Sequence, residues 1–286
     1  MEPNVEKYVD QLPWYFKSEI QYIDGWFLMG TPGPVMVILF AYLVFSLKVG
    51  PAFMENRPAL KLKIPLLIYN VAQVLYSAYV FWTGMTIILK YGLVRKKCMI
   101  DVPDVQLTAT SAFHYYLMAK VSELLDTVFF VLRKKKTQIT FLHVYHHTLM
   151  VAATWGMLKY NPTYVIILIG TINSFVHILM YAYYGLSAFP SLDKYLWWKK
   201  YLTAFQLIQF GIMIVHAAVA TAVSECTPSY ILLFTIFFNV LLMIYLFSDF
   251  YLKSYVKKED NIQVKSKNGH LKLNTNGFSH RTNKDS

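Results

Sequence analysis

Three histidines stand within five positions of the segment FLHVYHH, which runs from Phe141 to His147 and is otherwise uncharged. His143, His146 and His147 follow one another at i, i+3 and i+4, so on a helix their rings cover about 100° of one face. Imidazole binds metals, exchanges protons near neutral pH and attacks thioesters as a nucleophile. A role only in bracing the fold is the alternative, and it requires partners for two nitrogens on each ring. The cluster therefore predicts a metal site, a proton relay or a bond-forming histidine.

The segment KVSELLDT places charged side chains in a second apolar stretch. Lys120 and Glu123 stand at i and i+3 and can pair along a helix, with Asp126 at the margin of the same face. Charged groups inside a membrane span are costly, and by default they mark a functional cavity. The alternative is a solvated pair near the end of the span, because the basic run RKKK (133–136) follows closely.

Two later segments carry polar side chains that share one helix face, and these predict a polar pocket inside a helical bundle. Hydrogen bonding between helices is the alternative for the glutamines. The residues are Asn173, His177, Tyr181 and Tyr184 in NSFVHILMYAYY, and Gln206 and Gln209 in TAFQLIQF.

A metal site is the least favoured of the three chemistries. Membrane di-iron enzymes hold their metal with several histidine boxes, whereas this chain has one clustered box. Excluding His270 and His280 of the polar C-terminal tail leaves six of the eight histidines. The zinc spacing HExxH is also absent from the sequence. We therefore expect no metal at the site and assign the histidines to acid–base or nucleophilic work.

The elements that must position these residues are membrane helices. The 286 residues are 56% hydrophobic and 17% aromatic, and the mean hydropathy is +0.38. The apolar residues lie in blocks about 20 residues long, enough to cross a bilayer as helices. We predict an all-α membrane protein with residues 1–32 as an N-terminal segment, 33–256 as a seven-helix domain and 257–286 as a disordered tail. The seven spans are expected at 33–48, 64–89, 110–132, 138–158, 163–185, 201–222 and 228–252.

The charge pattern predicts the orientation of these spans. The formal net charge is +11, and the main basic clusters follow the odd-numbered spans, so all of them fall on one side. The positive-inside rule makes that side cytosolic, with a lumenal N-terminus and a cytosolic C-terminus. One basic run, VRKKC (94–98), conflicts with this assignment. Because the basic residues are loop residues between spans, they do not indicate nucleic-acid binding.

The two cysteines of the chain both fall on the predicted lumenal side. Cys98 follows the second span, and Cys226 lies between the sixth and seventh spans. Oxidation is permitted in that compartment, so we predict a disulfide between them. Two unpaired thiols are the alternative.

Four motifs, KVSELLDT, HVYHH, NSFVHILMYAYYG and TAFQLIQF, stand in this order in the chain. In that order they resemble the motif set of the very-long-chain fatty acid elongase family, the condensing enzymes of the endoplasmic reticulum. The resemblance covers spans two to seven. It implies condensation of a long-chain fatty acyl-CoA with malonyl-CoA, which gives a 3-ketoacyl-CoA two carbons longer, CO2 and CoA. It also implies that spans two to seven enclose an acyl-chain tunnel with the CoA end at its cytosolic mouth.

The resemblance also implies roles for the histidines. His146 matches the second histidine of the family box and is expected to form an acyl-imidazole. His177 is expected to act as a base or orienting partner, while His143 and His147 orient the network. Glu123 and Asp126 are expected to fix that network from the third span.

The remaining polar residues suit the substrates. Asn173, Tyr181, Gln206 and Gln209 are donors that can stabilise negative charge developing on oxygen. Lys120, Arg133 and Lys199 are basic residues expected at the mouth, where they can meet CoA phosphates. Charges that only prevent insertion are the alternative for the run RKKK. The enzyme is expected to need no cofactor beyond the two CoA substrates, and its expected partners are membrane lipid, other enzymes of the elongation cycle and a possible second copy.

Two other classes of protein stay open at this point. One is a di-iron desaturase or hydroxylase, and the other is a seven-helix receptor or lipid transporter without enzymatic activity. The length and saturation of the preferred acyl chain do not follow from the sequence.

Overall fold

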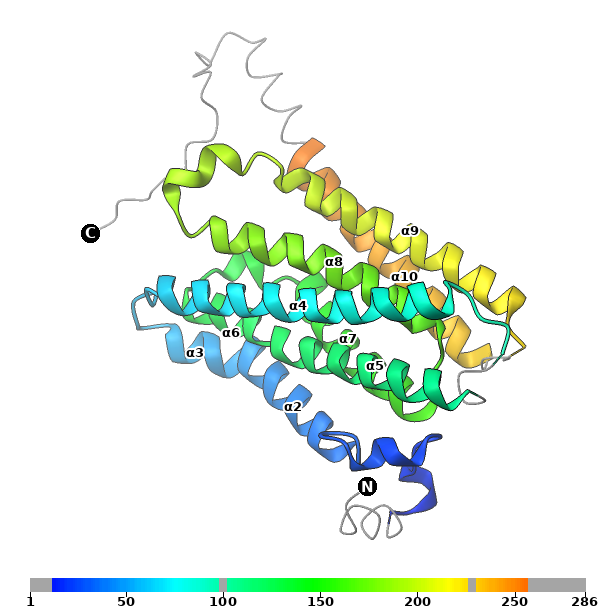
Figure 1. The fold of residues 1–286 in the computed structure, drawn as a ribbon. Helices are drawn as coiled ribbons and strands as arrows, with labels where there is room; N and C mark the ends of the chain where they lie inside the picture. The colour runs from blue at the N-terminus through cyan, green and yellow to red at the C-terminus, as the bar shows by residue number, and fades with distance from the viewer. Residues whose placement is uncertain (1–11, 98–101, 226–229, 257–286) are drawn as a thin grey trace.

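The computed structural model describes residues 12–97, 102–225 and 230–256. Cys98, Cys226 and the tail from residue 257 lie outside the described residues, so the predicted disulfide and the predicted disorder stay predictions. The described chain is helical (Figure 1). Its main helices are α2 (Gly33–Val44), α3 (Gly50–Met54), α4 (Lys63–Tyr91), α5 (Pro103–Glu123), α6 (Leu125–Leu132), α7 (Phe141–Tyr160), α8 (Val165–Leu186), α9 (Lys199–Val223) and α10 (Tyr230–Tyr251).

Shorter helices connect or extend these elements. They are η1 (Trp14–Phe16), η2 (Gln21–Gly25), η4 (Lys136–Gln138) and η5 (Pro190–Tyr195), with the π-helical segments η3 (Phe45–Val49) and η6 (Leu252–Val256). Because η3 joins α2 to α3 without a break, the first span runs to Met54, beyond the predicted end at residue 48.

Seven helical spans in the described residues match the seven predicted ones, and the chain is a multi-pass membrane protein. Five of them, over the part of the chain that the structure describes, are long and apolar enough by themselves to cross a membrane. They are Gly33–Met54, Lys63–Tyr91, Val165–Leu186, Lys199–Val223 and Leu233–Tyr255. The other two, α5–α6 and α7, are the spans that carry the charged motif and the histidine box.

The third span departs from the prediction in one respect that matters for the site. It begins at Pro103 rather than residue 110, and it is interrupted at Leu124, between the end of α5 and the start of α6. The Leu124 N–H bonds the carbonyl of Val121, a tighter turn than the α-helical pattern. The interruption falls between Glu123 and Asp126, the two acids of this span.

A capping side chain and a glycine mark the ends of two helices of the bundle. The side chain of Thr140 accepts a hydrogen bond from the backbone N–H of His143 at 3.2 Å, which caps α7 directly before the histidine box. At the far end of the second span, Gly92 directly follows α4, and its φ of 87° suits glycine best.

Six spans pack in a ring whose neighbours are α4, α8, α9, α10, α7 and α5, with α5 returning to α4. The α4–α8 contact is the most extensive of these. A Cβ built on Gly84 of α4 would lie only 2.0 Å from Oγ1 of Thr171 in α8, so the absence of a side chain lets the two helices approach. The first span lies outside the ring, where α3 contacts α6 and α2 contacts α7 (Figure 1).

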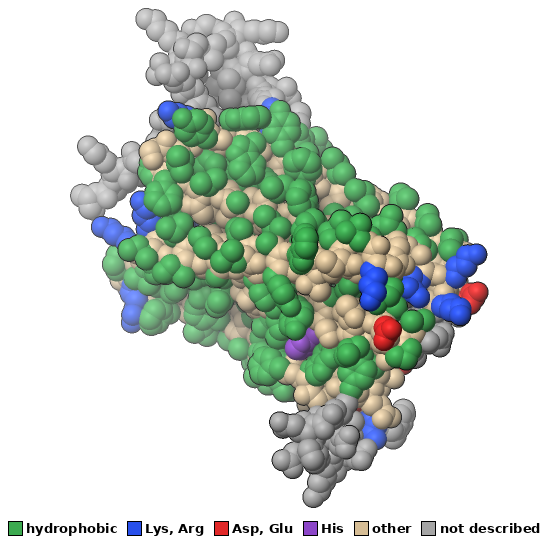
Figure 2. All heavy atoms as spheres, viewed as in Figure 1, with side chains coloured by type: hydrophobic (Ala, Val, Ile, Leu, Met, Phe, Trp, Pro, Cys, Tyr) green, Lys and Arg blue, Asp and Glu red, His purple; other side chains and the backbone are tan. Residues whose placement is uncertain are grey.

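The outer surface has the composition expected beside lipid. Hydrophobic side chains cover the middle of the face seen in Figure 2, and Lys and Arg side chains gather near its ends. Large apolar side chains such as Phe40, Leu75, Trp82 and Phe234 are exposed. A surface this apolar is stable only when lipid covers it.

The segment before the first span is fixed to one end of the ring by buried polar contacts. Nζ of Lys159, at the end of α7, lies 2.6 Å from Oδ1 of Asp24 and 2.9 Å from the carbonyl of Gly30. Asp24 also accepts hydrogen bonds from Ser18. The Tyr22 hydroxyl lies 2.9 Å from Oγ1 of Thr110, and burial raises the pKa of this phenol. These contacts make residues 18–30 part of the packed structure.

Candidate active site

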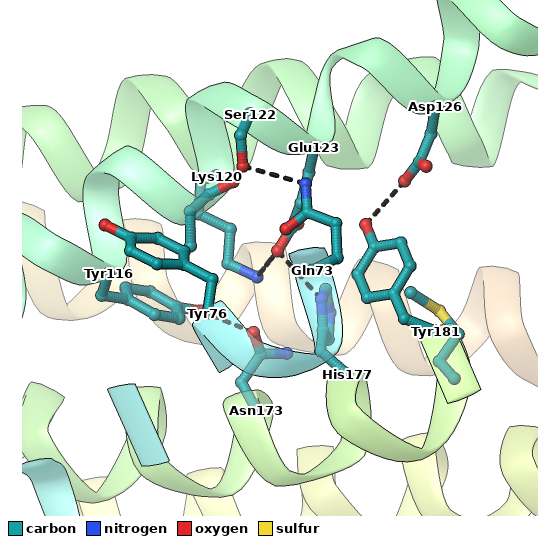
Figure 3. Close-up of polar contacts among 12 residues, drawn as sticks. Gln73, Tyr76, Tyr116, Lys120, Ser122, Glu123, Asp126, Asn173, His177 and Tyr181 are labelled. Carbon is teal, nitrogen blue, oxygen red and sulfur yellow. Dashed lines mark hydrogen bonds and ion pairs between the residues drawn. The ribbon is translucent and has the colours of Figure 1, made fainter. Parts of the chain in front are cut away.

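A buried carboxylate at the centre of the ring contacts both an ammonium and an imidazole (Figure 3). Nζ of Lys120 lies 2.9 Å from Oε1 and 3.1 Å from Oε2 of Glu123. Nδ1 of His177 lies 2.9 Å from the same Oε1. This second contact has the length of an ion pair, but its N–H is not aligned well enough to count as a hydrogen bond. All three side chains are buried, so Glu123 fixes a lysine of its own helix and a histidine of α8.

A second cross-helix contact lies beside this cluster. The Tyr116 hydroxyl of α5 donates a hydrogen bond to Oδ1 of Asn173 in α8 at 2.8 Å. Asn173 and His177 are one helical turn apart on the same face, so α8 meets α5 through two successive polar side chains. The Lys120 ammonium also lies 4.8 Å from the centre of the Tyr116 ring.

Asp126, which follows the interruption at Leu124, has a different partner from Glu123. Its Oδ2 accepts a hydrogen bond from the Tyr181 hydroxyl at 2.7 Å (Figure 3). The Tyr181 ring, which is fully buried, stands edge-on to that of Tyr69 in α4, with 6.0 Å between the ring centres. The two acids of the third span therefore contact α8 one turn apart.

The three rings of the histidine box contact one another on α7. The ring centres of His143 and His147 are 4.4 Å apart, and those of His146 and His147 are 5.4 Å apart. His146 also meets the ring of Phe247 in α10, at 6.4 Å between centres. Nε2 of His143 lies 2.8 Å from Oγ1 of Thr127.

Electrostatic interactions join this box to the buried cluster. His146 interacts with Lys120, His177 and Glu123, and His147 interacts with Glu123 and Lys120. The structure therefore places His177 of α8 in contact with Glu123, and His146 and His147 of α7 close enough to interact with its charge.

The other residues named from the sequence occupy more varied positions. Gln206 and Gln209 both lie on α9, where Gln209 is buried and Nε2 of Gln206 is 4.0 Å from Sδ of Met180. Tyr184 is 40% exposed and contacts Tyr181 through its ring edge. Arg133 caps the end of α6 and Lys199 begins α9.

Lys120 differs from its expected position. We expected it among the basic residues at the mouth, where CoA phosphates would bind, but it is buried and paired with Glu123. Its ammonium donates to both carboxylate oxygens of Glu123 inside the ring.

Several residues of this region escaped the sequence reasoning. Gln73 of α4 is buried and donates a hydrogen bond through Nε2 to Oγ of Ser122 at 3.0 Å. Asn70, Gln73 and Ser77 stand at i, i+3 and i+7 in the second span, so the periodicity used elsewhere would have found this polar face. Tyr116 stands one turn before Lys120 on the same face, but it was not singled out because a tyrosine in an apolar segment is commonly a packing residue.

A metal centre receives no support from the geometry of the described ranges. Within residues 12–97, 102–225 and 230–256, no three His, Cys, Asp or Glu side chains converge in a way that could hold a metal ion. The expectation of a site without metal stays a prediction. The arrangement does supply a buried network of imidazoles, a fixed carboxylate and hydroxyl donors, which suits acyl transfer and proton transfer.

Over most of its length, the chain is similar to members of a single protein family. Residues 27–263 match the model of the GNS1/SUR4 family (ELO). The chain is 42% identical to very long chain fatty acid elongase 2 of Mus musculus over 252 residues, which is 86% of this chain and 84% of the relative. It is 36% identical over 258 residues to very long chain fatty acid elongase 7 of Drosophila melanogaster, covering 87% of this chain and 78% of the relative.

A human relative aligns over a still longer stretch. Very long chain fatty acid elongase 4 of Homo sapiens is 35% identical over 271 residues, which is 93% of this chain and 84% of the relative. Each of these alignments is long enough to include the spans that form the ring and the buried cluster.

Proposed function

The chain belongs to the GNS1/SUR4 family of fatty acid elongases, and on that basis we propose that it condenses a long-chain fatty acyl-CoA with malonyl-CoA. The products are a 3-ketoacyl-CoA two carbons longer, CO2 and free CoA. The observation that carries the proposal is the Glu123 carboxylate, which contacts Lys120 and His177 beside the histidine box. A carboxylate at ion-pair distance from an imidazole stabilises the imidazolium that forms when the ring accepts a proton, which supports acid–base catalysis.

The first step is acyl transfer to the enzyme. The neutral imidazole of His146 attacks the thioester carbonyl, the C–S bond breaks, and the thiolate leaves as CoA after taking a proton. The product is an acyl-imidazole, which is reactive enough to pass its acyl group on. His146 suits this role because it lies in the box, next to His147, and interacts electrostatically with His177 and Glu123.

The second step forms the new carbon–carbon bond. Malonyl-CoA loses CO2 and becomes an enolate, whose carbon attacks the acyl carbonyl and releases the His146 imidazole. Negative charge develops on oxygen in both events, and preorganised donors stabilise it. Asn173, Tyr181, Gln206 and Gln209 are the candidate donors. His177 orients the reacting groups and exchanges the proton that the His146 imidazole gives up on acylation and takes back when it is released.

We also propose where the CoA groups bind and how the enzyme is oriented in the membrane. The loops that follow α3, α6 and α8 carry the basic clusters, and there Arg133 and Lys199 meet the CoA phosphates. That end faces the cytosol and the N-terminal segment faces the lumen of the endoplasmic reticulum, in keeping with the positive-inside rule. No further cofactor takes part.

Intact mass spectrometry after incubation with an acyl-CoA alone tests the covalent step. We expect a mass increase equal to one acyl group, removed by malonyl-CoA and absent from His146→Ala. Incorporation of labelled malonyl-CoA into a 3-ketoacyl product tests the overall reaction. Elongation without an adduct would favour direct condensation with histidine as a base. Lack of elongation together with stoichiometric iron would favour a desaturase or hydroxylase.

A further inference from the structure

A hydrogen-bonded chain of three side chains connects the first span, outside the ring, to the histidine box. The Tyr42 hydroxyl of α2 lies 2.8 Å from Oγ1 of Thr127 in α6. The same Oγ1 lies 2.8 Å from Nε2 of His143 in α7. Tyr42 is 6% exposed and Thr127 is fully buried, so both hydroxyls are screened from solvent. A residue of the one span that takes no part in the ring thus reaches the first histidine of the box.

The first span is held close to α6 at a second point. A Cβ built on Gly50 of α3 would lie 2.7 Å from Cγ1 of Val131 in α6, so any side chain there would push the two helices apart. The π-helical turn Phe45–Val49 lies between Tyr42 and Gly50. Such turns re-aim the residues around them and are frequent near functional sites. The position of the Tyr42 hydroxyl is therefore set by the packing of two helices.

The hydroxyl groups of this hydrogen-bonded chain can donate toward His143 or away from it, and donation toward His143 is favoured. In that direction the Tyr42 O–H donates to Oγ1 of Thr127, and the Thr127 O–H donates to Nε2 of His143. In the reverse direction Tyr42 has to donate to a further acceptor, and the described residues place none within hydrogen-bond distance of it. A buried hydroxyl without an acceptor is costly. The favoured direction leaves Nε2 of His143 without a proton and Nδ1 with one.

We propose that Tyr42 is a positioning residue of the active site, which fixes the tautomer and ring orientation of His143 through Thr127. The His143 ring lies against that of His147, which in turn contacts His146. Fixing the orientation of the His143 ring therefore helps to fix the orientation of the other two rings of the histidine box. This inference rests on the proposed condensation, because it assigns Tyr42 an effect on turnover. Tyr42 touches no substrate and acts only through its neighbours.

The test is a double-mutant cycle on the two hydroxyls. Tyr42→Phe and Thr127→Val each remove one hydroxyl while keeping the shape of the side chain, and Thr127→Ser keeps the hydroxyl. We expect kcat to fall about five- to tenfold in each of the first two variants, with KM unchanged, and to stay near the wild-type value in Thr127→Ser. The double variant should be no slower than Thr127→Val alone, because both changes interrupt the same series of hydrogen bonds.

The molecule contains a matched control for the loss of a tyrosine–threonine hydrogen bond. Tyr22 and Thr110 form the same kind of contact, at 2.9 Å, between the N-terminal segment and α5. Tyr22→Phe removes a hydroxyl of the same chemistry that has no hydrogen bond to the histidine box. It should lower the midpoint of thermal unfolding about as much as Tyr42→Phe does, while kcat stays at the wild-type value.

Nitrogen NMR of histidine-labelled protein reports the tautomer independently of turnover, with His143→Gln used to assign the signal. We expect an unprotonated Nε2 on His143 in the wild type and a mixture of tautomers in Tyr42→Phe. The inference would be overturned if the wild type is active and Tyr42→Phe has the same kcat. It would also be overturned if His143 has the same tautomer in both proteins. A wild type that fails to elongate while Tyr42→Phe still alters the tautomer would instead refute the proposed function.

Discussion

Oε1 of Glu123 lies 2.9 Å from Nζ of Lys120 and also 2.9 Å from Nδ1 of His177, so one carboxylate oxygen joins a pair within α5 to a histidine of α8. Such a group cannot be altered without consequences for both partners, since each is buried. The fold and the chemistry of the site therefore depend on the same side chain.

Replacing this carboxylate should show both effects. Glu123→Gln leaves the Lys120 ammonium buried without its counter-ion, and we expect a loss of about 3 kcal/mol in the free energy of unfolding together with loss of elongation. Unfolding in detergent and malonyl-CoA incorporation measure the two. Lys120→Met combined with Glu123→Gln should recover part of the stability but not the activity. Recovery of both would mean that the carboxylate serves the fold alone.

His177 should act after the enzyme has been acylated. We expect His177→Gln to form the acyl adduct with acyl-CoA but to release product about 100-fold more slowly when malonyl-CoA is added, the usual scale for loss of a positioned acid–base group. Single-turnover mass spectrometry follows the adduct through both stages. An adduct that never forms in this variant would place His177 in the first step.

The close approach of α4 and α8 should depend on Gly84. Gly84→Ala places a methyl group 2.0 Å from Oγ1 of Thr171, and we expect a loss of about 2 kcal/mol in stability. Thr171→Ala in the same chain removes the obstructing atom and should restore most of the loss. Gly156 of α7 is the matched control, because a Cβ there meets nothing within 4 Å. Gly156→Ala should raise the stability slightly through helix propensity, whereas a similar loss at both glycines would argue against the packing explanation.

The N-terminal segment should detach when its buried ion pair is broken. Lys159→Met leaves Asp24 without its counter-ion, and we expect proteases to cut within residues 12–32 at concentrations that leave the wild type intact. Limited proteolysis in detergent with mapping of the fragments is the measurement. Replacing Asp24 with Leu in the same chain should reduce the cutting, because no unpaired charge is then buried. Resistance of the single variant would show that apolar packing alone holds the segment.

The predicted disulfide has one indirect support in the described residues. The backbone N–H of Glu225 donates a hydrogen bond to the carbonyl of Lys96 at 2.8 Å, so the chain just before each cysteine belongs to a pair of adjoining loops. We expect peptide mapping without reductant to find Cys98 linked to Cys226. Alkylation of both thiols in the untreated protein would establish the alternative.

Periodicity along the sequence predicted the faces of the helices, but not which helices meet. It placed Lys120 beside Glu123, because residues three apart on one helix are neighbours whatever surrounds them. It also grouped Asn173 with His177. It did not predict that Tyr116 reaches Asn173 or that Tyr42 reaches Thr127, since these contacts depend on the order of the helices in the ring. The interruption at Leu124 was equally hidden, because neither glycine nor proline marks it.

The pairing of Lys120 with Glu123 has a consequence for how the chain enters the bilayer during synthesis. A lone charge at the centre of a helix costs about 3 kcal/mol to insert, and this span carries a lysine with an acid one turn away. Because the partners lie on the same helix, their charges offset each other as soon as that turn forms, before α8 has left the ribosome. His177 then docks onto a carboxylate that is already neutralised. The buried cluster can thus be assembled in sequence order, with the charges of Lys120 and Glu123 compensated before α8 arrives.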